Sequence, residues 1–194
     1  RFACEDAGTF WLSETPDEPG SVGWDGSWPR IATWVRLRDR RTDATLVYLN
    51  THLDHEGPRA RREGARLLRE RLPALRANST GDTEGSSDPD PDLDPDPVVV
   101  AGDFNCTDDA EPYAVLAGTA GHESPLTDAR TACPHPPHGP DTTRTDFESL
   151  RPDRRIDHVF VDGVAVENYG VAADVTGGGW YPSDHLPVVV DLTL

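Results

Sequence analysis

Short apolar runs alternate with polar turns along this chain, and their spacing predicts a mixed α/β fold. Residues 31–37 and 45–50 alternate apolar and polar positions as strands do. The charged turn at 38–44 predicts that these two strands pair as a hairpin. Residues 10–12 predict an earlier short strand, followed by a long loop rich in Pro and Gly. Further strands are expected near the C-terminus, over 155–161 and 186–192.

A helix followed by a buried strand occupies the middle of the sequence. Residues 57–76 place apolar side chains at spacings of three and four, which predicts an amphipathic helix. Its arginines (Arg59, Arg62, Arg66 and Arg69) lie on another side. We interpret them as a solvated face paired with Glu63 and Glu70, with a phosphate-binding patch as the alternative. Residues 98–101 form a continuous apolar run, typical of a strand buried on both faces of a layered α/β domain.

Between that helix and that strand, residues 77–97 repeat Asp-Pro pairs. Proline extends neither a helix nor a strand ladder, and the segment carries no core residues. We therefore expect a disordered, solvated acidic loop inside one domain that spans residues 1–194. Residues 108–117 predict a short helix, and residues 133–145 another loop.

Charge and composition narrow the class of protein. Acidic residues number 35 against 18 basic ones, all arginine, which gives a net charge of -17. Such a surface argues against a general nucleic-acid coat, and without lysine it is typical of proteins that work in concentrated salt. No apolar run approaches the ~18 residues of a membrane span. Three scattered cysteines (Cys4, Cys106 and Cys133) predict free thiols in a cytoplasmic protein.

Polar residues that carry chemistry stand at the ends of the predicted strands, where α/β folds place their sites. They are His52 after the second hairpin strand, Asp103 and Asn105 after the buried strand, Asp157 within 155–161, and Asp184 and His185 before the last strand. Carboxylates, an amide and imidazoles suit Mg²⁺ or Mn²⁺ together with a phosphate-ester substrate. The sequence indicates no protein partner.

Two other chemistries remain open on the residues alone. Zinc is one, with His52 and His55 or with Asp184 and His185 as ligands, although no HExxH arrangement is present. A Ser-His-Asp hydrolase is the other, with Ser183 or Ser13 as the nucleophile, although no GxSxG turn is present.

Six motifs in this order, FWLSETP, RIATW, NTHLDH, GDFN, IDHVFV and SDHLPVVVDL, resemble the endonuclease/exonuclease/phosphatase superfamily over residues 10–192. FWLSETP followed by NTHLDH resembles a microbial branch close to its deadenylase-like members. The resemblance implies a four-layer α-β-β-α sandwich. It also implies Mg²⁺- or Mn²⁺-dependent hydrolysis of a phosphodiester or phosphomonoester, in nucleic acid, a nucleotide, or a lipid or inositol phosphate.

The resemblance also assigns roles at matching positions. Three residues would act on the phosphate: His52 binds the scissile phosphate, Asn105 orients water and phosphate, and Arg30 makes contact near the phosphate. Asp103 would contact the metal or position the attacking water, and Asp184 would ligate the metal. His185 would stabilise the charged transition state, and Asp157 would orient His185. Metal and hydrogen-bond donors there offset the negative charge that in-line attack builds on phosphate oxygens.

One part of the family pattern has no counterpart in this chain. The family carries an upstream strand with a Gln-Glu motif, whose glutamate is its principal metal ligand. Residue 1 is not a methionine, so we expect a processed chain or a C-terminal part, with the sandwich incomplete at its N-terminus. A catalytically inactive remnant, acting as a binding or scaffold module, is therefore the alternative to the enzyme.

Overall fold

The computed structural model describes residues 1–77 and 94–194. Along the described chain the elements are β1 (Phe2–Trp11), β2 (Ile31–Asp39), β3 (Thr45–His52), α1 (Pro58–Arg76), β4 (Val98–Asp103), α2 (Glu111–Ala117), β5 (Thr127–Asp128), α3 (Ala129–Ala132), β6 (Asp157–Asp162), β7 (Ala165–Val171) and β8 (Val188–Thr193). The two hairpin strands, the long helix and the buried strand confirm the main predictions.

Two sheets form the frame of the molecule. The larger sheet has six strands in the order β1-β2-β3-β4-β6-β5, and β7 pairs with β8 in a second, two-stranded sheet. Within the larger sheet β3 and β4 run parallel, whereas β4 and β6 are antiparallel. The C-terminal ends of β3 and β4 therefore meet the first residues of β6 at one edge.

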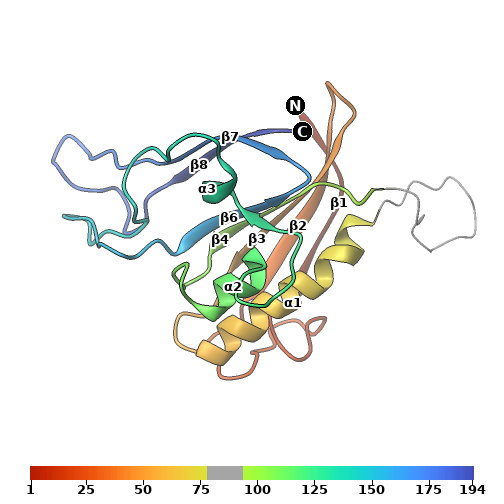
Figure 1. The fold of residues 1–194 in the computed structure, drawn as a ribbon. Coiled ribbons are helices and arrows are strands. Elements are labelled where there is room, and N and C mark those ends of the chain that lie inside the picture. The colour runs from red at the N-terminus through yellow and green to blue at the C-terminus, as the bar shows by residue number, and fades with distance from the viewer. Residues whose placement is uncertain (78–93) are drawn as a thin grey trace, which may run out of the picture.

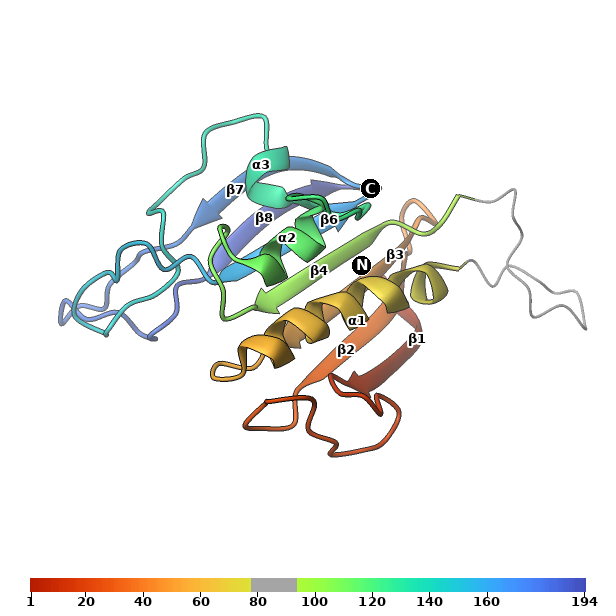
Figure 2. The ribbon, with the colours of Figure 1, turned by 60° about the horizontal axis from the view of Figure 1, so that its bottom comes forward.

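The sheets and helices are stacked in layers. Figures 1 and 2 show α1 and α2 on one face of the large sheet, with β7 and β8 on its other side. Val98 and Val100 of β4 belong to the core under the helices, whereas Val99 belongs to the core between the sheets. The mixed α/β fold is confirmed. The outer helical layer expected beyond the second sheet is not found among the described residues, where the single-turn α3 packs beside β7.

Gly102 fixes how closely β4 approaches β3. Its φ is +148°, and a Cβ atom at this position would lie 1.9 Å from the carbonyl oxygen of Thr51. Only glycine fits there without moving the neighbouring backbone. This close approach brings the residue that follows, Asp103, beside the end of β3.

Three elements were not predicted from the sequence. The strand β5 has two residues and α3 has four, which is too short for a periodic pattern. The strand β7 is longer, but its pairing with β8 shifts register between Val166 and Asn168. A bulge of this kind interrupts the alternation of apolar and polar positions that marks a strand.

The end of the Asp-Pro segment differs from the expected solvated loop. Residues 78–93 lie outside the described residues, but Asp96 is buried with 2% of its surface exposed. Its carboxylate pairs with Arg36, and its backbone carbonyl accepts a hydrogen bond from Arg76 at 2.6 Å. Asp96 thus ties the end of α1 to the start of β4.

Two expectations from composition can be compared with the structure. The three cysteines are free thiols, as expected: Cys4 is exposed, Cys133 is partly buried and Cys106 is buried. In the described ranges, no helix combines the length and the apolar character that crossing a membrane requires.

Candidate active site

Three neighbouring strands place His52, Asp103 and Asp157 side by side. In the strand ladders His52 lies opposite Asp103, and Asp103 lies opposite Asp157. Alternation along each strand turns all three side chains toward the face that carries the second sheet. The sequence predicted all three residues, and the structure brings them together at one edge of the large sheet.

Asp103 is at the centre of this cluster. Its Oδ1 accepts a hydrogen bond from the backbone N–H of Asn105 at 2.8 Å. Its Oδ2 lies 3.3 Å from Nε2 of His52 and 3.7 Å from Nε2 of His185. Asn105 adopts a left-handed conformation with φ +48°, and its Nδ2 donates to the carbonyl of Leu53 at 2.9 Å. One carboxylate oxygen is therefore anchored, and the other faces two imidazoles.

His185 has a defined hydrogen-bond partner at each ring nitrogen. Asp157 Oδ2 lies 2.8 Å from Nδ1, and Nη1 of Arg144 lies 2.5 Å from Nε2. A guanidinium only donates, so the pattern assigns the proton to Nδ1 and the lone pair to Nε2. Burial raises the pKa of Asp157, although its hydrogen bond with His185 opposes the shift.

Arg144 is a site residue that the sequence analysis missed. Besides contacting His185, its Nη1 lies 2.8 Å from Oδ2 of Asp184. Two loops hold it there: the backbone N–H of Thr145 donates to the carbonyl of Asp184, and Leu186 donates to Thr143. Figure 1 shows both loops projecting together beyond the ends of β6, β7 and β8. An arginine within a long loop carries no sequence signal that would have identified it.

The buried carboxylate of Asp54 stabilises the part of the site that contains Arg30. It accepts hydrogen bonds from the backbone N–H groups of Gly57, Glu56 and Ser27, and it lies 3.5 Å from Nε of Arg30. Burial would raise its pKa, but these bonds outweigh it and lower the pKa to about 2. Asp54 lies two residues after His52 and shortly before α1. Aspartate is common just ahead of a helix, and this position is a signal that could have identified Asp54 from the sequence.

Arg30 is oriented toward His55, since its Nη2 lies 2.9 Å from Nδ1 of that ring. The pKa of His52 is lowered, first by burial and then by the positive charge of Arg30 and by that of His185 when its ring is protonated, whereas Asp103 acts in the opposite direction. The predicted Arg30 is therefore close enough to act on His52. A neutral His52 can donate a hydrogen bond or accept one without a charge change at neutral pH.

One group among the described residues has the composition and spacing of a metal centre. Asp103, Asp157 and His185 each offer a ligand atom, and these atoms lie within 4.8 Å of one another. Two of the three donors are carboxylates, which Mg²⁺ and Mn²⁺ prefer. Asp184 lies outside this group and is paired with Arg144.

The serine hydrolase alternative finds no support in the geometry. Oγ of Ser183 accepts a hydrogen bond from the backbone N–H of His185, and Oγ of Ser13 shares one with Ser21. Neither hydroxyl bonds an imidazole in the described structure, so neither has the base that a serine nucleophile needs.

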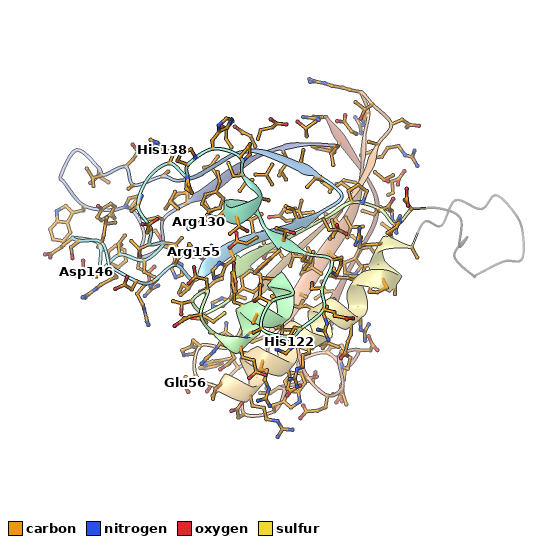
Figure 3. All side chains as sticks on the ribbon, in the orientation of Figure 1. Glu56, His122, Arg130, His138, Asp146 and Arg155 are labelled. Carbon is orange, nitrogen blue, oxygen red and sulfur yellow. The ribbon has the colours of Figure 1, made fainter. Side chains whose placement is uncertain are left out.

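His158 points to the opposite face of the sheet from Asp157, as alternation predicts. It is 1% exposed, its Nε2 donates to the carbonyl of Cys106 at 2.9 Å, and its Nδ1 accepts from Arg155. Burial and the charge of Arg155 lower its pKa to about 4. Figure 3 labels Arg155, which also pairs with the buried Asp128. His158 thus braces the loop that carries Asn105.

Comparison with known proteins shows the family to which this chain belongs. The sequence profile described as "Endonuclease/Exonuclease/phosphatase family" matches residues 85–185. The structure of a mannosyl-6-phosphatase from Bacteroides thetaiotaomicron is similar at 32% identity and TM-score 0.80, over 100% of this chain and 68% of that one. An endonuclease/exonuclease/phosphatase from Bacteroides vulgatus is similar at 31% identity and TM-score 0.80, over 100% and 67%.

A more distant likeness extends to a human protein. The human Nocturnin catalytic domain has 17% identity and TM-score 0.66, with 100% of this chain and 60% of that chain covered, and it supports the fold alone. This chain spans about two thirds of the length of the solved structures that it resembles. A comparison with curated proteins finds no match.

Proposed function

Because this chain belongs to the endonuclease/exonuclease/phosphatase family, we propose that it is a metal-dependent phosphoesterase that hydrolyses a phosphodiester or phosphomonoester by in-line attack of water. The observation that carries the proposal is the position of Asp103, whose free carboxylate oxygen faces both His52 and His185. A carboxylate between two imidazoles can orient a water molecule beside groups that stabilise phosphate charge.

Each residue has a task that its contacts support. Asp103 Oδ2 accepts a proton from the attacking water or orients it, while the N–H of Asn105 holds Oδ1 in place. Asp157 binds Nδ1 of His185 and so directs Nε2 toward Asp103, where it accepts from Arg144. When Nε2 is protonated it no longer accepts from Arg144 and donates to a phosphate oxygen instead, and Asp157 stabilises the positive charge on the ring. His52 and Arg30 add donors on the opposite side of Asp103.

The donor set fits a divalent cation, with Mg²⁺ or Mn²⁺ favoured by its carboxylate oxygens. We propose Asp103 as a ligand because both its motif position and the geometric cluster indicate it, and Asp184 because of its motif position. Asp157 and His185 are engaged with each other, which supports their catalytic roles instead. When bound, the ion would offset negative charge on phosphate oxygens and make the attacking water more acidic.

We propose that the substrate is a phosphate ester. The protein would hydrolyse it either as a nuclease hydrolyses a phosphodiester or as a phosphatase hydrolyses a phosphomonoester. The similar Bacteroides thetaiotaomicron structure is a mannosyl-6-phosphatase, which supports a phosphomonoester of a small molecule. Nucleotides and nucleic acid remain within the same chemistry. The assembled cluster of His52, Asp103, Asp157 and His185 supports an enzyme over an inactive binding or scaffold module.

The direct test is phosphate release or diester cleavage over a panel of substrates. The panel contains a sugar 6-phosphate, a nucleoside monophosphate, an oligonucleotide and bis(p-nitrophenyl) phosphate, each with Mg²⁺, with Mn²⁺ and with EDTA. We expect hydrolysis of at least one compound with either ion and none with EDTA. His185→Ala should abolish it, whereas His135→Ala, an exposed histidine on a loop, should not.

Two results would contradict the proposed phosphoesterase. A folded wild-type protein that cleaves nothing in the panel would favour the binding module. Hydrolysis that survives both EDTA and His185→Ala would require a different mechanism.

The composition also supports proposals about the compartment and the salt concentration in which the protein works. Free thiols and the acidic, lysine-free surface support a cytoplasmic protein adapted to concentrated salt. The two apolar cores share the large sheet, which supports a single domain over residues 1–194.

A further inference from the structure

A pocket lined by arginines lies beside Asn105. Its volume is about 620 Å³. We call it the arginine pocket and define it by Arg59, Arg61, Arg62, Asn105, Glu111 and Arg154. Four guanidinium groups face one carboxylate there, in a chain where 35 acidic residues oppose 18 basic ones. The local charge is therefore opposite to that of the protein as a whole.

Two of the four pocket arginines, Arg59 and Arg154, have side chains without a hydrogen bond or ion pair among the described residues. Arg61 donates to a backbone carbonyl, that of Asp54, at 2.9 Å. Arg62 is engaged, since it pairs with Glu63 at 2.8 Å and with Glu111 of the pocket at 3.7 Å. Further along α1 the arginines are engaged: Arg66 pairs with Glu63 and Glu111, Arg69 donates to the carbonyl of Glu123, and Arg71 pairs with Asp17. On α1, therefore, Arg59 is the pocket arginine whose side chain has no partner among the described residues, whereas Arg62, Arg66, Arg69 and Arg71 are engaged.

Helix stability does not account for the position of the pocket arginines. Arg59, Arg61 and Arg62 lie in the first turns of α1, where positive charge opposes the helix dipole. The backbone N–H groups of Arg59 and Ala60 are already taken by the carboxylate of Asp25. Cations are thus gathered where the helix itself favours anions, and Arg59 among them stays available to a ligand.

The arginine pocket adjoins the catalytic cluster. Asn105 lines the pocket, and its backbone N–H donates to Oδ1 of Asp103 at 2.8 Å. Arg154 lines both this pocket and a second one of about 690 Å³, which contains Arg144 and Asp184. Asn105 and Arg154 therefore connect the arginine pocket to the residues that the proposed function places at the reacting phosphate.

We propose that the arginine pocket binds a second phosphate group of the substrate, next to the phosphate that is hydrolysed. This inference rests on the proposed function and names the substrate class: an ester that carries at least two phosphates. Guanidinium groups suit this task because their planar forks donate paired hydrogen bonds to phosphate oxygens. The second phosphate belongs either to a small bisphosphate or to the next linkage of an oligonucleotide.

The test measures binding in EDTA, so that no metal-dependent hydrolysis intervenes. Isothermal titration compares thymidine 3′,5′-bisphosphate with thymidine 5′-monophosphate on the wild type, Arg59→Ala and Arg154→Ala. We expect the wild type to bind the bisphosphate at least about tenfold more tightly, and each variant to lose most of that preference. Arg154→Lys should keep part of it, since charge remains without the fork.

Arg41→Ala is the matched control. Arg41 is exposed in the turn before β3, at the opposite end of that strand from His52, and its loss changes the net charge equally. It should leave both affinities unchanged. Thermal melts of all variants establish that they fold.

A short oligothymidylate distinguishes the two sources of the second phosphate. Binding tighter than the bisphosphate, with the same dependence on Arg59 and Arg154, indicates an oligonucleotide, and weaker binding indicates a small bisphosphate. If the wild type binds the bisphosphate no more tightly than the monophosphate, or if the pocket variants keep the preference, the inference is wrong. Hydrolysis in the substrate panel is measured separately, so an active enzyme without this preference would refute the inference alone.

Discussion

His185 is held by Asp157, whose Oδ2 lies 2.8 Å from Nδ1 of the imidazole. The bond links the two sheets, from the first residue of β6 in the large sheet to the loop before β8 in the small one. It fixes which ring nitrogen faces Asp103. Orientation and charge of this histidine therefore depend on one carboxylate, and the first prediction follows from that dependence.

Replacing Asp157 by Asn should lower kcat on the best panel substrate by on the order of 10²-fold, with little change in KM. Asparagine can fill the same space, but it no longer stabilises a positive charge on His185. Steady-state kinetics on the purified variant checks this. Asp174→Asn, at an exposed aspartate, serves as the control. A kcat within a few fold of wild type would remove the orienting role of Asp157.

Binding of a divalent ion should be visible without any substrate. Asp103 and Asp157 lie within the same cluster and repel each other when both are ionised. Mg²⁺ or Mn²⁺ should therefore raise the melting temperature, by an amount equivalent to about 2.7 kcal/mol at a concentration one hundred times Kd. Differential scanning fluorimetry over a metal series measures it. Asp103→Asn should abolish the increase, and an undiminished increase in that variant would place the ion elsewhere.

Arg144→Ala should reduce kcat/KM by roughly tenfold or more, because it removes a guanidinium that contacts both His185 and Asp184. Arg144→Lys should restore only part of the loss, since one ammonium cannot replace the planar fork. The comparison uses Arg151→Ala, an exposed arginine in the same loop, which pairs with Asp146 there; Figure 3 labels Asp146. Equal losses in Arg144→Ala and Arg151→Ala would contradict a specific role for Arg144.

Protonation of His158 should destabilise the fold at acid pH. Its pKa is about 4 in the folded state against 6.5 for an unperturbed histidine, so the unfolded chain binds the proton first. The stabilisation is complete above pH 6.5 and is lost as pH falls toward about 4. Urea unfolding at several pH values measures this slope. His158→Gln should show a smaller loss over the same range, whereas His135→Ala should follow the wild type.

Salt should stabilise this protein. The net charge of -17 produces repulsion across the surface, which molar KCl screens by shortening the Debye length to ~3 Å. We expect the melting temperature to rise by several degrees between about 0.1 M and 2 M KCl. A parallel series in sucrose separates screening from general solute exclusion. A melting temperature that stays flat or falls would show that the surface ion pairs outweigh the net repulsion.

The main elements could be predicted because each has a local pattern. The alternation in 31–37 and 45–50, the helical spacing in 57–76 and the apolar run at 98–101 report directly which face of each segment is buried. The elements that escaped prediction lack such a pattern. The strand β7 is bulged, and β5 and α3 are stabilised by the packing around them rather than by their own length.

Motif matching named His52, Asp103, Asn105, Asp157, Asp184 and His185 as a set, and alternation placed His158 on the opposite face from Asp157. These inferences are local, because strand ends and the two-residue period follow from short stretches of sequence.

Only the tertiary structure decided which of these side chains meet. Asp103 lies beside His52 and Asp157 because the parallel pair β3–β4 and the antiparallel pair β4–β6 share the strand β4, and Gly102 lets β4 approach β3. His185 reaches the same point from the loop before β8. Arg144 reaches His185 through two loops that hydrogen-bond to each other across about forty positions of sequence, a contact that no local pattern encodes. The arginine pocket likewise joins the start of α1 to a loop nearly one hundred residues later, so its charge exists only in the folded chain.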